Sequence, residues 1–139
     1  MLGVYMPMKW QLEVIMYVKI DFNSDEAIYI QLRNQIIYGI ATSQIQEGDN
    51  LPSVRELAEY IGINMHTVNK AYTILKQEGY VKLDRRKGAV IAIDIDKIQA
   101  IEDMKEELRV ILAKAICKNI SCQDVFEVVG EIFNEFERG

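Results

Sequence analysis

The stretch LPSVRELAEYIGINMHTVNKAYTILKQEGYV, residues 51–81, decides the fold. Two amphipathic segments are separated by a glycine, and the second restarts at once with polar residues. Ser53 is expected to cap the first helix, SVRELAEYI, and Gly62 to end it in the left-handed conformation. Asn64 is expected to cap the second helix, MHTVNKAYTILKQEG, which stops at Gly79. This spacing predicts a helix-turn-helix.

Segments on both sides complete the predicted domain. Residues 23–45 predict a preceding helix, capped by Asn23 or Ser24, because apolar residues recur along it at four-residue spacing. After the second helix, YVKLD and AVIAID predict the strands of a β-hairpin, with RRKG as its charged turn. Helix, helix, turn, helix and hairpin is the order of a winged helix-turn-helix. We therefore expect a mainly α fold with a small β-hairpin over residues 21–93.

The chain continues on both sides of this domain. Residues 1–20 are expected to be an extension that ends in a short strand, MYVKIDF, and we hypothesise that residues 1–15 have no essential role. Residues 94–139 predict two amphipathic helices, with Ser121 capping the second. Two such helices bury little area alone, so we expect them to form a dimerisation tail. The residues expected in that interface are Ile98, Ile101, Leu108, Ile111, Leu112, Val125, Val129, Ile132, Phe133 and Phe136.

Composition indicates a globular protein of the reducing cytoplasm. Of the 139 residues, 50% are hydrophobic and 27% are charged, which is enough for a packed core. No apolar run approaches the ~20 residues of a membrane span, and no signal peptide is recognisable.

Cys117 and Cys122 are expected to be small buried hydrophobes, with a redox role left open. They lie far in sequence from His66, the single histidine, so no metal site or other cofactor is expected.

Charge is unevenly distributed along the chain. Residues 53–93 carry seven basic and four acidic side chains, whereas residues 1–52 carry three and six, and residues 94–139 carry six and eleven. The net charge of -5 therefore hides a basic island within acidic flanks. Phosphate contacts are local, so the charge of this island matters more for nucleic-acid binding than the net charge of the chain. The island therefore indicates a nucleic-acid partner.

Polar residues on three elements of the basic island predict DNA contacts. A helix-turn-helix places the start of its second helix in the major groove, where base edges offer donors and acceptors. A helix N-terminus and a basic hairpin tip can each bind the phosphate backbone. Alternatives remain open: Arg55 could pair with Glu59, and Met65 could touch a thymine methyl or simply pack. The expected DNA-binding residues are Ser53, Arg55, Asn64, His66, Thr67, Asn69, Lys70, Arg85, Arg86, Lys87 and Gly88.

The segments LPSVRELA, GINMHTVNKAY, LKQEGYV and the glycine-bearing hairpin resemble the GntR family of bacterial transcription regulators. The resemblance covers residues 25–93 and implies a dimer that binds an inverted-repeat operator in double-stranded DNA. By position, it places DNA contacts at Arg55, His66, Thr67, Asn69 and the wing, residues 85–88. Many relatives have arginine where this chain has Met65 and Asn69, so a different set of bases is expected.

The 46 residues after the hairpin further resemble the YtrA-type subgroup, whose short helical tail dimerises and whose members commonly repress operons for ABC transporters. An enzyme is not expected, because no phosphate loop, metal cluster or nucleophile constellation appears in the sequence. A winged helix that binds protein rather than specific DNA is the alternative function. A small-molecule effector is left open.

Overall fold

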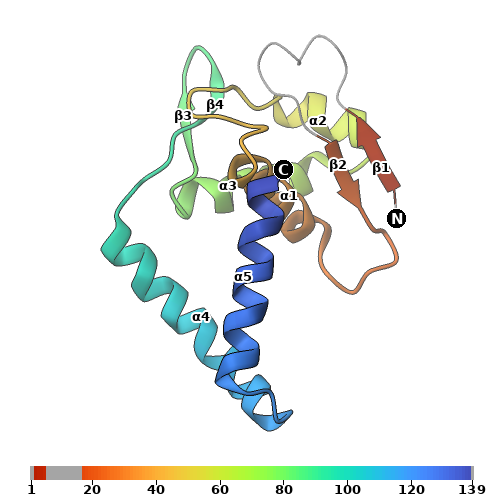
Figure 1. Cartoon of the computed structure of the whole chain (residues 1–139). Coiled ribbons are helices and arrows are strands. Elements are labelled where there is room, and N and C mark those ends of the chain that lie inside the picture. The colour runs from red at the N-terminus through yellow and green to blue at the C-terminus, as the bar shows by residue number, and fades with distance from the viewer. Residues whose placement is uncertain (1, 6–16, 139) are drawn as a thin grey trace. The chain divides into compact units, whose positions relative to one another are not determined.

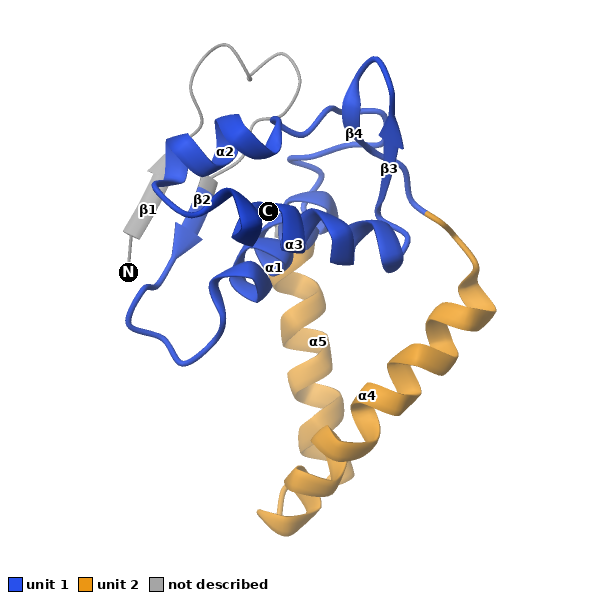
Figure 2. Ribbon diagram, turned by 180° about the vertical axis from the view of Figure 1, so that it is seen from behind, with its two compact units in different colours: residues 1–93 blue, residues 94–139 orange. Residues whose placement is uncertain are grey.

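The structure is a computed structural model that describes residues 2–5 and 17–138 of the chain. It forms two compact units, residues 1–93 and residues 94–139 (Figure 2). The elements, labelled in Figure 1, are β1 (Leu2–Tyr5), β2 (Tyr17–Ile20), α1 (Ile28–Ala41), α2 (Val54–Ile61), α3 (Met65–Gln77), β3 (Val81–Asp84), β4 (Gly88–Ile91), α4 (Lys97–Cys117) and α5 (Cys122–Arg138). The expected mainly α fold with a small hairpin is confirmed.

The core of unit 1 is built where α1, α2 and α3 meet. Each helix turns a regular apolar stripe inward, and the central side chains of these stripes are fully buried: Leu32 and Ile36 from α1, Leu57 from α2, and Val68 and Leu75 from α3. Because the stripe on α3 faces the other two helices, its opposite side is left to solvent. Helical spacing predicts core positions in these two helices, and all of them except the partly exposed Val54 are buried: Val54, Leu57, Ala58, Ile61, Val68, Ala71, Tyr72 and Leu75.

Helix α1 is shorter at both ends than residues 23–45. Its first residue is Ile28, because the Gln31 side chain donates to the Asp21 and Glu26 carbonyls and accepts from the Asp21 amide, which holds the preceding loop. At the other end the chain turns back, and Ile45 donates its amide to the Gly39 carbonyl at 2.9 Å. A Cβ on Gly39 would lie 2.6 Å from Ile45 Cδ1, so glycine permits this close approach.

The wing contains a third backbone segment that the sequence did not predict. Strands β3 and β4 pair antiparallel, with Val81 opposite Ile91 and Asp84 opposite Gly88. Residues 46–52, QEGDNLP, predict only a turn, because they are rich in turn formers. Part of this segment instead pairs with the other edge of β4: the Gly48 amide donates to the Ile91 carbonyl at 2.8 Å, and the Leu51 amide to the Ala89 carbonyl at 2.9 Å. Both edges of β4 are therefore hydrogen-bonded.

A second small sheet joins the N-terminal residues. The predicted strand is confirmed as β2, and its Val18 and Ile20 are fully buried in the core of unit 1. Strand β1 was not predicted, and it pairs antiparallel with β2, Leu2 opposite Ile20. Residues 6–16 lie outside the described part of the chain, so the hypothesis on residues 1–15 stays a prediction.

Unit 2 is a helical hairpin formed by α4 and α5. Ser121 caps α5 as expected: its Oγ accepts from the Asp124 amide at 3.1 Å, and the Asp124 carboxylate accepts from the Ser121 amide at 3.0 Å. The two helices meet at this turn and diverge from it (Figures 1 and 2). Over the described residues, neither of these helices nor any other has the length and hydropathy needed to cross a membrane.

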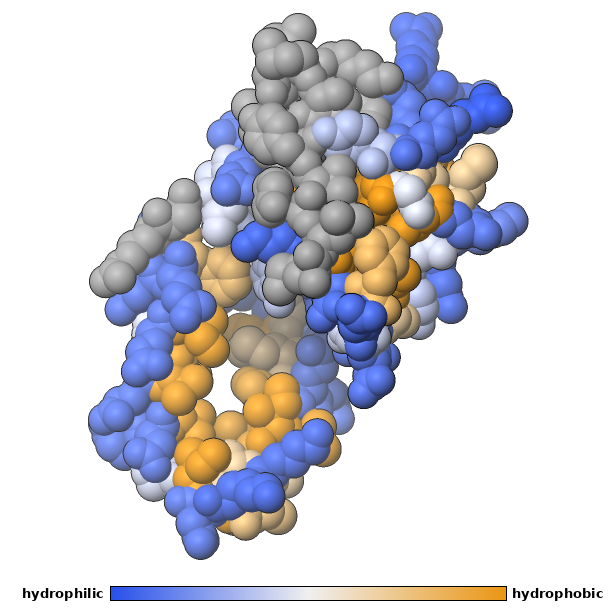
Figure 3. Space-filling view, turned by 90° about the vertical axis from the view of Figure 1, so that its right-hand side faces the viewer, coloured by the Kyte–Doolittle hydropathy of each residue, from blue (hydrophilic) through white to orange (hydrophobic). Residues whose placement is uncertain are grey.

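Apolar side chains of unit 2 remain open to solvent in the single chain. Among residues 94–137, none is buried, and Ile98, Phe126 and Phe133 are exposed. Figure 3 shows orange, apolar side chains facing the space between the two arms of the hairpin, with hydrophilic side chains on the outer sides. Cys117 and Cys122 are also exposed, so the expectation that they are buried is wrong, because this hairpin has no closed core to bury them.

Candidate nucleic-acid interface

The corner between α2 and α3 is fixed by three local features that the sequence predicted. Ser53 Oγ accepts from the Glu56 amide at 3.1 Å and starts α2. Gly62 ends α2 with φ at 83°, a left-handed conformation in which residues other than glycine are strained. Asn64 Oδ1 accepts from the His66 amide at 2.7 Å and starts α3. The first turn of α3 is thereby placed next to the first turn of α2.

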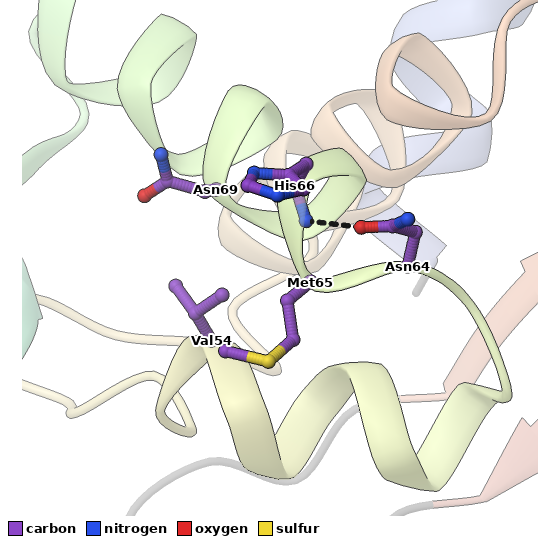
Figure 4. Close-up of a pocket in the computed structure, with 5 residues that line it drawn as sticks. All are labelled: Val54, Asn64, Met65, His66 and Asn69. Carbon is purple, nitrogen blue, oxygen red and sulfur yellow. Dashed lines mark hydrogen bonds between the residues drawn. The ribbon is translucent and has the colours of Figure 1, made fainter.

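The first turn of α3 carries exposed polar side chains on the side away from the core. Asn64, His66 and Asn69 lie around a shallow, open depression, together with Val54 and Met65 (Figure 4). In Figure 4, His66 and Asn69 lie beside each other, while Met65 extends from the start of α3 toward Val54 at the start of α2. The structure thus brings three of the predicted DNA-binding residues together at one place.

Two other predicted residues of α3 lie differently. Thr67 is only partly exposed, because it sits between the depression and the buried stripe. The Lys70 ammonium lies 4.0 Å from the centroid of the Tyr29 ring of α1, a cation–π contact. Lys70 therefore has a partner within unit 1, although its side chain remains on the surface.

Arg55 is on the surface of the first turn of α2, as predicted. Its Nε lies 3.8 Å from the Glu59 carboxylate one turn along, and the two side chains are 77% and 73% exposed. An exposed pair at this distance contributes little to stability, on the order of 0.5 kcal/mol. The guanidinium can consequently leave Glu59 for a phosphate at small energetic cost.

A buried tyrosine fixes the start of α2 against α3. The Tyr72 hydroxyl donates a 2.7 Å hydrogen bond to the Pro52 carbonyl, and the tyrosine is only 5% exposed. Burial, reinforced by the negative charge of Glu56, raises the pKa of Tyr72 above its ordinary value, so the hydroxyl keeps its proton and the bond. Ser53 and Arg55 follow directly after this anchored carbonyl.

The basic hairpin tip is a rigid turn rather than a loose loop. Asp84 Oδ1 accepts from the amides of Arg86 at 2.7 Å and Lys87 at 3.0 Å, and Asn50 Nδ2 donates to the Lys87 carbonyl at 2.6 Å. The two amides, with a smaller contribution from the Lys87 charge, lower the pKa of the Asp84 carboxyl, which stays ionised. The turn closes at Gly88, whose φ of 78° suits glycine.

This turn presents three basic side chains to solvent. Arg85, Arg86 and Lys87 are all exposed, and over residues 2–5 and 17–138 no ion pair within 4.0 Å involves them. Three exposed cations on a fixed turn are suited to phosphate oxygens. The described residues contain no cluster of three or more His, Cys, Asp or Glu that could hold a metal ion.

Sequence reasoning missed the residues that support the interface. Tyr72 was predicted as core, but its hydroxyl also anchors the start of α2, and Asn50 was predicted only as a turn former. Val54 was predicted as core and is partly exposed in the depression. The hydroxyl is the one signal that could have revealed the anchoring role of Tyr72, because a polar group on a buried aromatic ring needs a hydrogen-bond partner.

Known proteins match the chain over this interface and beyond it. The family model described as bacterial regulatory proteins, gntR family, matches residues 25–91. The transcriptional repressor YtrA of Bacillus subtilis is 32% identical over 88% of this chain and 96% of its own length. An uncharacterised HTH-type regulator of the same organism, YhcF, is 33% identical over 63% of this chain and 70% of its own.

Solved structures agree with these relatives. YtrA from Sulfolobus acidocaldarius, a GntR-family transcription factor, superposes with a TM-score of 0.61 at 39% identity, over 72% of this chain and 97% of that one. A protein described as a transcriptional antiterminator from Listeria monocytogenes superposes with a TM-score of 0.76 at 25% identity, over 85% and 90% of the two chains. These relatives are named as a repressor, a regulator, a transcription factor and an antiterminator, and none is named as an enzyme. This chain belongs to the GntR family of DNA-binding transcription regulators, within its YtrA-type subgroup.

Proposed function

We propose that the chain is a homodimeric repressor that binds an inverted-repeat operator in the cytoplasm. The observation that carries the proposal is that three elements of unit 1 expose suitable side chains: the polar first turn of α3, Arg55 on α2, and Arg85–Lys87 at the wing tip. Base edges require hydrogen-bonding side chains of modest length, and phosphates require cations, so the three elements divide these two tasks. YtrA of Bacillus subtilis, which is similar to this chain, is named a repressor, and this supports repression as the direction of regulation.

Each predicted residue receives a role on this basis. Asn64, His66 and Asn69 read base edges, because their side chains surround the open depression at the start of α3. The contacts to phosphate come from Arg55, Arg85, Arg86 and Lys87, with the Ser53 turn and the Gly88 backbone giving the close approach. Thr67 and Lys70 contribute at the edge of the interface, where they are partly engaged within unit 1.

The proposed dimer uses the apolar faces of unit 2. Single chains leave these side chains exposed, and contiguous apolar surface of this kind is normally covered by a partner. A twofold dimer covers the same face on both copies and supplies one unit 1 for each operator half-site. Half-sites read in this way are ~34 Å apart, one turn of DNA. The acidic excess of residues 94–139 then lies on the outer faces of the tail.

The DNA-binding part is tested by selecting operators from a pool of random duplexes with the full-length protein. We expect enrichment of an inverted repeat, and an affinity that falls steeply with salt because phosphate contacts release counterions. Replacing Arg85 and Arg86 with alanine should reduce that salt dependence, while Lys118→Ala, a cation of unit 2, serves as the matched control. A protein that enriches no sequence, or whose binding ignores salt, would be a protein-interaction module instead.

The dimer is tested with two substitutions that add the same charge to opposite sides of α4. Leu108→Glu changes the predicted interface, whereas Val110 lies about 200° away around the helix and is 58% exposed. Light scattering should show a monomer for Leu108→Glu and a dimer for Val110→Glu. If both variants remain dimeric, the interface lies elsewhere.

The regulated genes form the last part of the proposal. Because the subgroup commonly represses operons for ABC transporters, we propose such an operon as the target. Transcript levels after deletion of the gene test this directly: repression predicts a rise in transporter transcripts, and a fall would indicate activation. An operator found only beside unrelated genes would remove the transporter assignment.

A further inference from the structure

The depression at the start of α3 has an apolar side as well as a polar rim. Met65 is the first residue of α3, is 49% exposed, and points toward Val54, the first residue of α2 (Figure 4). On the basis of the DNA-binding function proposed above, we infer that Met65, with Val54 beside it, contacts the 5-methyl group of a thymine in each operator half-site.

The chemistry of the major groove leaves one match for these two side chains. Base edges in that groove display hydrogen-bond donors, acceptors and a single kind of apolar group, the thymine methyl. The hydrocarbon surfaces of Met65 and Val54 gain nothing from a donor or an acceptor, but they gain from covering a methyl group. The thioether side chain is unbranched and flexible, so it can adjust to the methyl without moving the helix.

The exposure of Met65 separates this role from simple packing. A methionine whose only task is to fill the seam between α2 and α3 would be buried, as Leu57 and Val68 are on the core side of the same two helices. Met65 is instead 49% exposed and lines the depression, on the side of α3 that carries His66 and Asn69. In the proposed binding mode, a base edge lies against it.

The polar rim fits the same assignment. Asn64 and Asn69 carry amides, and an amide can pair with the N6 and N7 atoms of adenine in the major groove. Asn64 Oδ1 is occupied by the His66 amide, which leaves the Asn69 amide as the freer reader. A half-site in which the thymine lies next to an adenine therefore suits the depression as a whole.

The experiment removes the methyl group from the DNA without changing base pairing. Each thymine of the selected operator is replaced, in symmetric pairs, by deoxyuridine, which lacks only the 5-methyl group. At one pair of positions the full-length protein should bind about fourfold more weakly for each half-site, which corresponds to ~0.8 kcal/mol for one covered methyl-sized group. Other positions should change much less.

Protein variants assign the effect to Met65. Met65→Ala should bind the thymine and deoxyuridine operators equally, with the affinity of the wild-type protein for the deoxyuridine operator. Met65→Leu keeps an apolar side chain of similar volume and should keep the preference for thymine. Met65→Gln, of nearly the same length but polar at its end, should lose the preference, and it provides a second test if the alanine variant folds poorly.

Two results would overturn the inference while leaving the DNA-binding function intact. In the first, no thymine position of the operator responds to deoxyuridine. In the second, Met65→Ala still prefers thymine at the sensitive position, so that another residue reads the methyl. Failure of the wild-type protein to enrich any operator would refute the proposed function, and this inference with it.

Discussion

Tyr72→Phe should destabilise the protein at neutral pH, and this loss should disappear at alkaline pH. The substitution removes one buried hydroxyl and its 2.7 Å hydrogen bond to the Pro52 carbonyl. A net hydrogen bond contributes about 1 kcal/mol, and leaving a buried acceptor unpaired adds to the loss. We therefore expect the free energy of unfolding to fall by about 1.5 kcal/mol at pH 8.

The pH dependence follows from the direction of the Tyr72 pKa shift. Burial raises this pKa in the folded state above the value of about 10 for the unfolded chain. The unfolded chain then releases the phenolic proton first, so the contribution of Tyr72 is present below pH 10 and is lost as the pH rises above it. Each further pH unit costs the wild-type protein about 1.4 kcal/mol that phenylalanine does not lose. The two proteins should be nearly equal in stability at pH 11.

Urea denaturation followed by far-UV circular dichroism measures this difference at pH 8, 10 and 11. Protein concentration is held constant, because a dimer links stability to concentration. Ile36→Val is the matched control: it removes one methylene from a fully buried site and costs about 1 kcal/mol, with no titratable group involved. Its difference from wild type should be independent of pH. A constant difference for Tyr72→Phe as well would refute the buried-hydroxyl argument.

Three smaller changes test the local features of the interface. Ser53→Ala should lower the free energy of unfolding by about 1 kcal/mol in urea denaturation, whereas Ser53→Asp, which can also cap α2, should lose little. Gly62→Ala should cost about 1–2 kcal/mol by the same assay; an added Cβ meets nothing within 4 Å, so only the left-handed backbone opposes it. Asp84→Ala should speed hydrogen exchange at the Arg86 and Lys87 amides; in wild type this protection should hold at neutral pH and be lost as acidification passes the lowered pKa of Asp84.

Features that depend on neighbouring residues in the sequence could be predicted. The caps at Ser53, Asn64 and Ser121 and the left-handed Gly62 were all recognisable, because each is made by a side chain or a glycine within three residues of the helix end it serves. The buried stripe of α3 was equally recognisable from its helical spacing. These local rules were enough to place the recognition helix within the fold.

Features that depend on residues distant in the chain could not be predicted. The start of α1 at Ile28 depends on Gln31, whose side chain satisfies the backbone of a loop up to ten residues away. The hydrophobic pattern gives no sign of such a contact. In addition, the acidic residues before Ile28 are of the kind typically found at a helix start, so the sequence predicts an earlier start. Likewise, Cys117 and Cys122 follow an apolar pattern, but the two helices of a single chain form no closed core that could bury them.

The segment 48–53 illustrates how much of the interface such distant contacts determine. Its composition is that of a turn, yet its backbone pairs with β4, Asn50 holds the Lys87 carbonyl of the wing tip, and the Pro52 carbonyl is held by Tyr72 of α3. Ser53, at its end, starts the helix that carries Arg55. One six-residue segment therefore connects all three elements that present the side chains proposed to bind DNA. Backbone hydrogen bonds join the segment to β4, and the Asn50 and Tyr72 side chains join it to the wing tip and to α3, so these elements are restrained relative to one another within unit 1. The role proposed for Met65 benefits from this restraint, since a fixed helix start limits where its flexible side chain can reach.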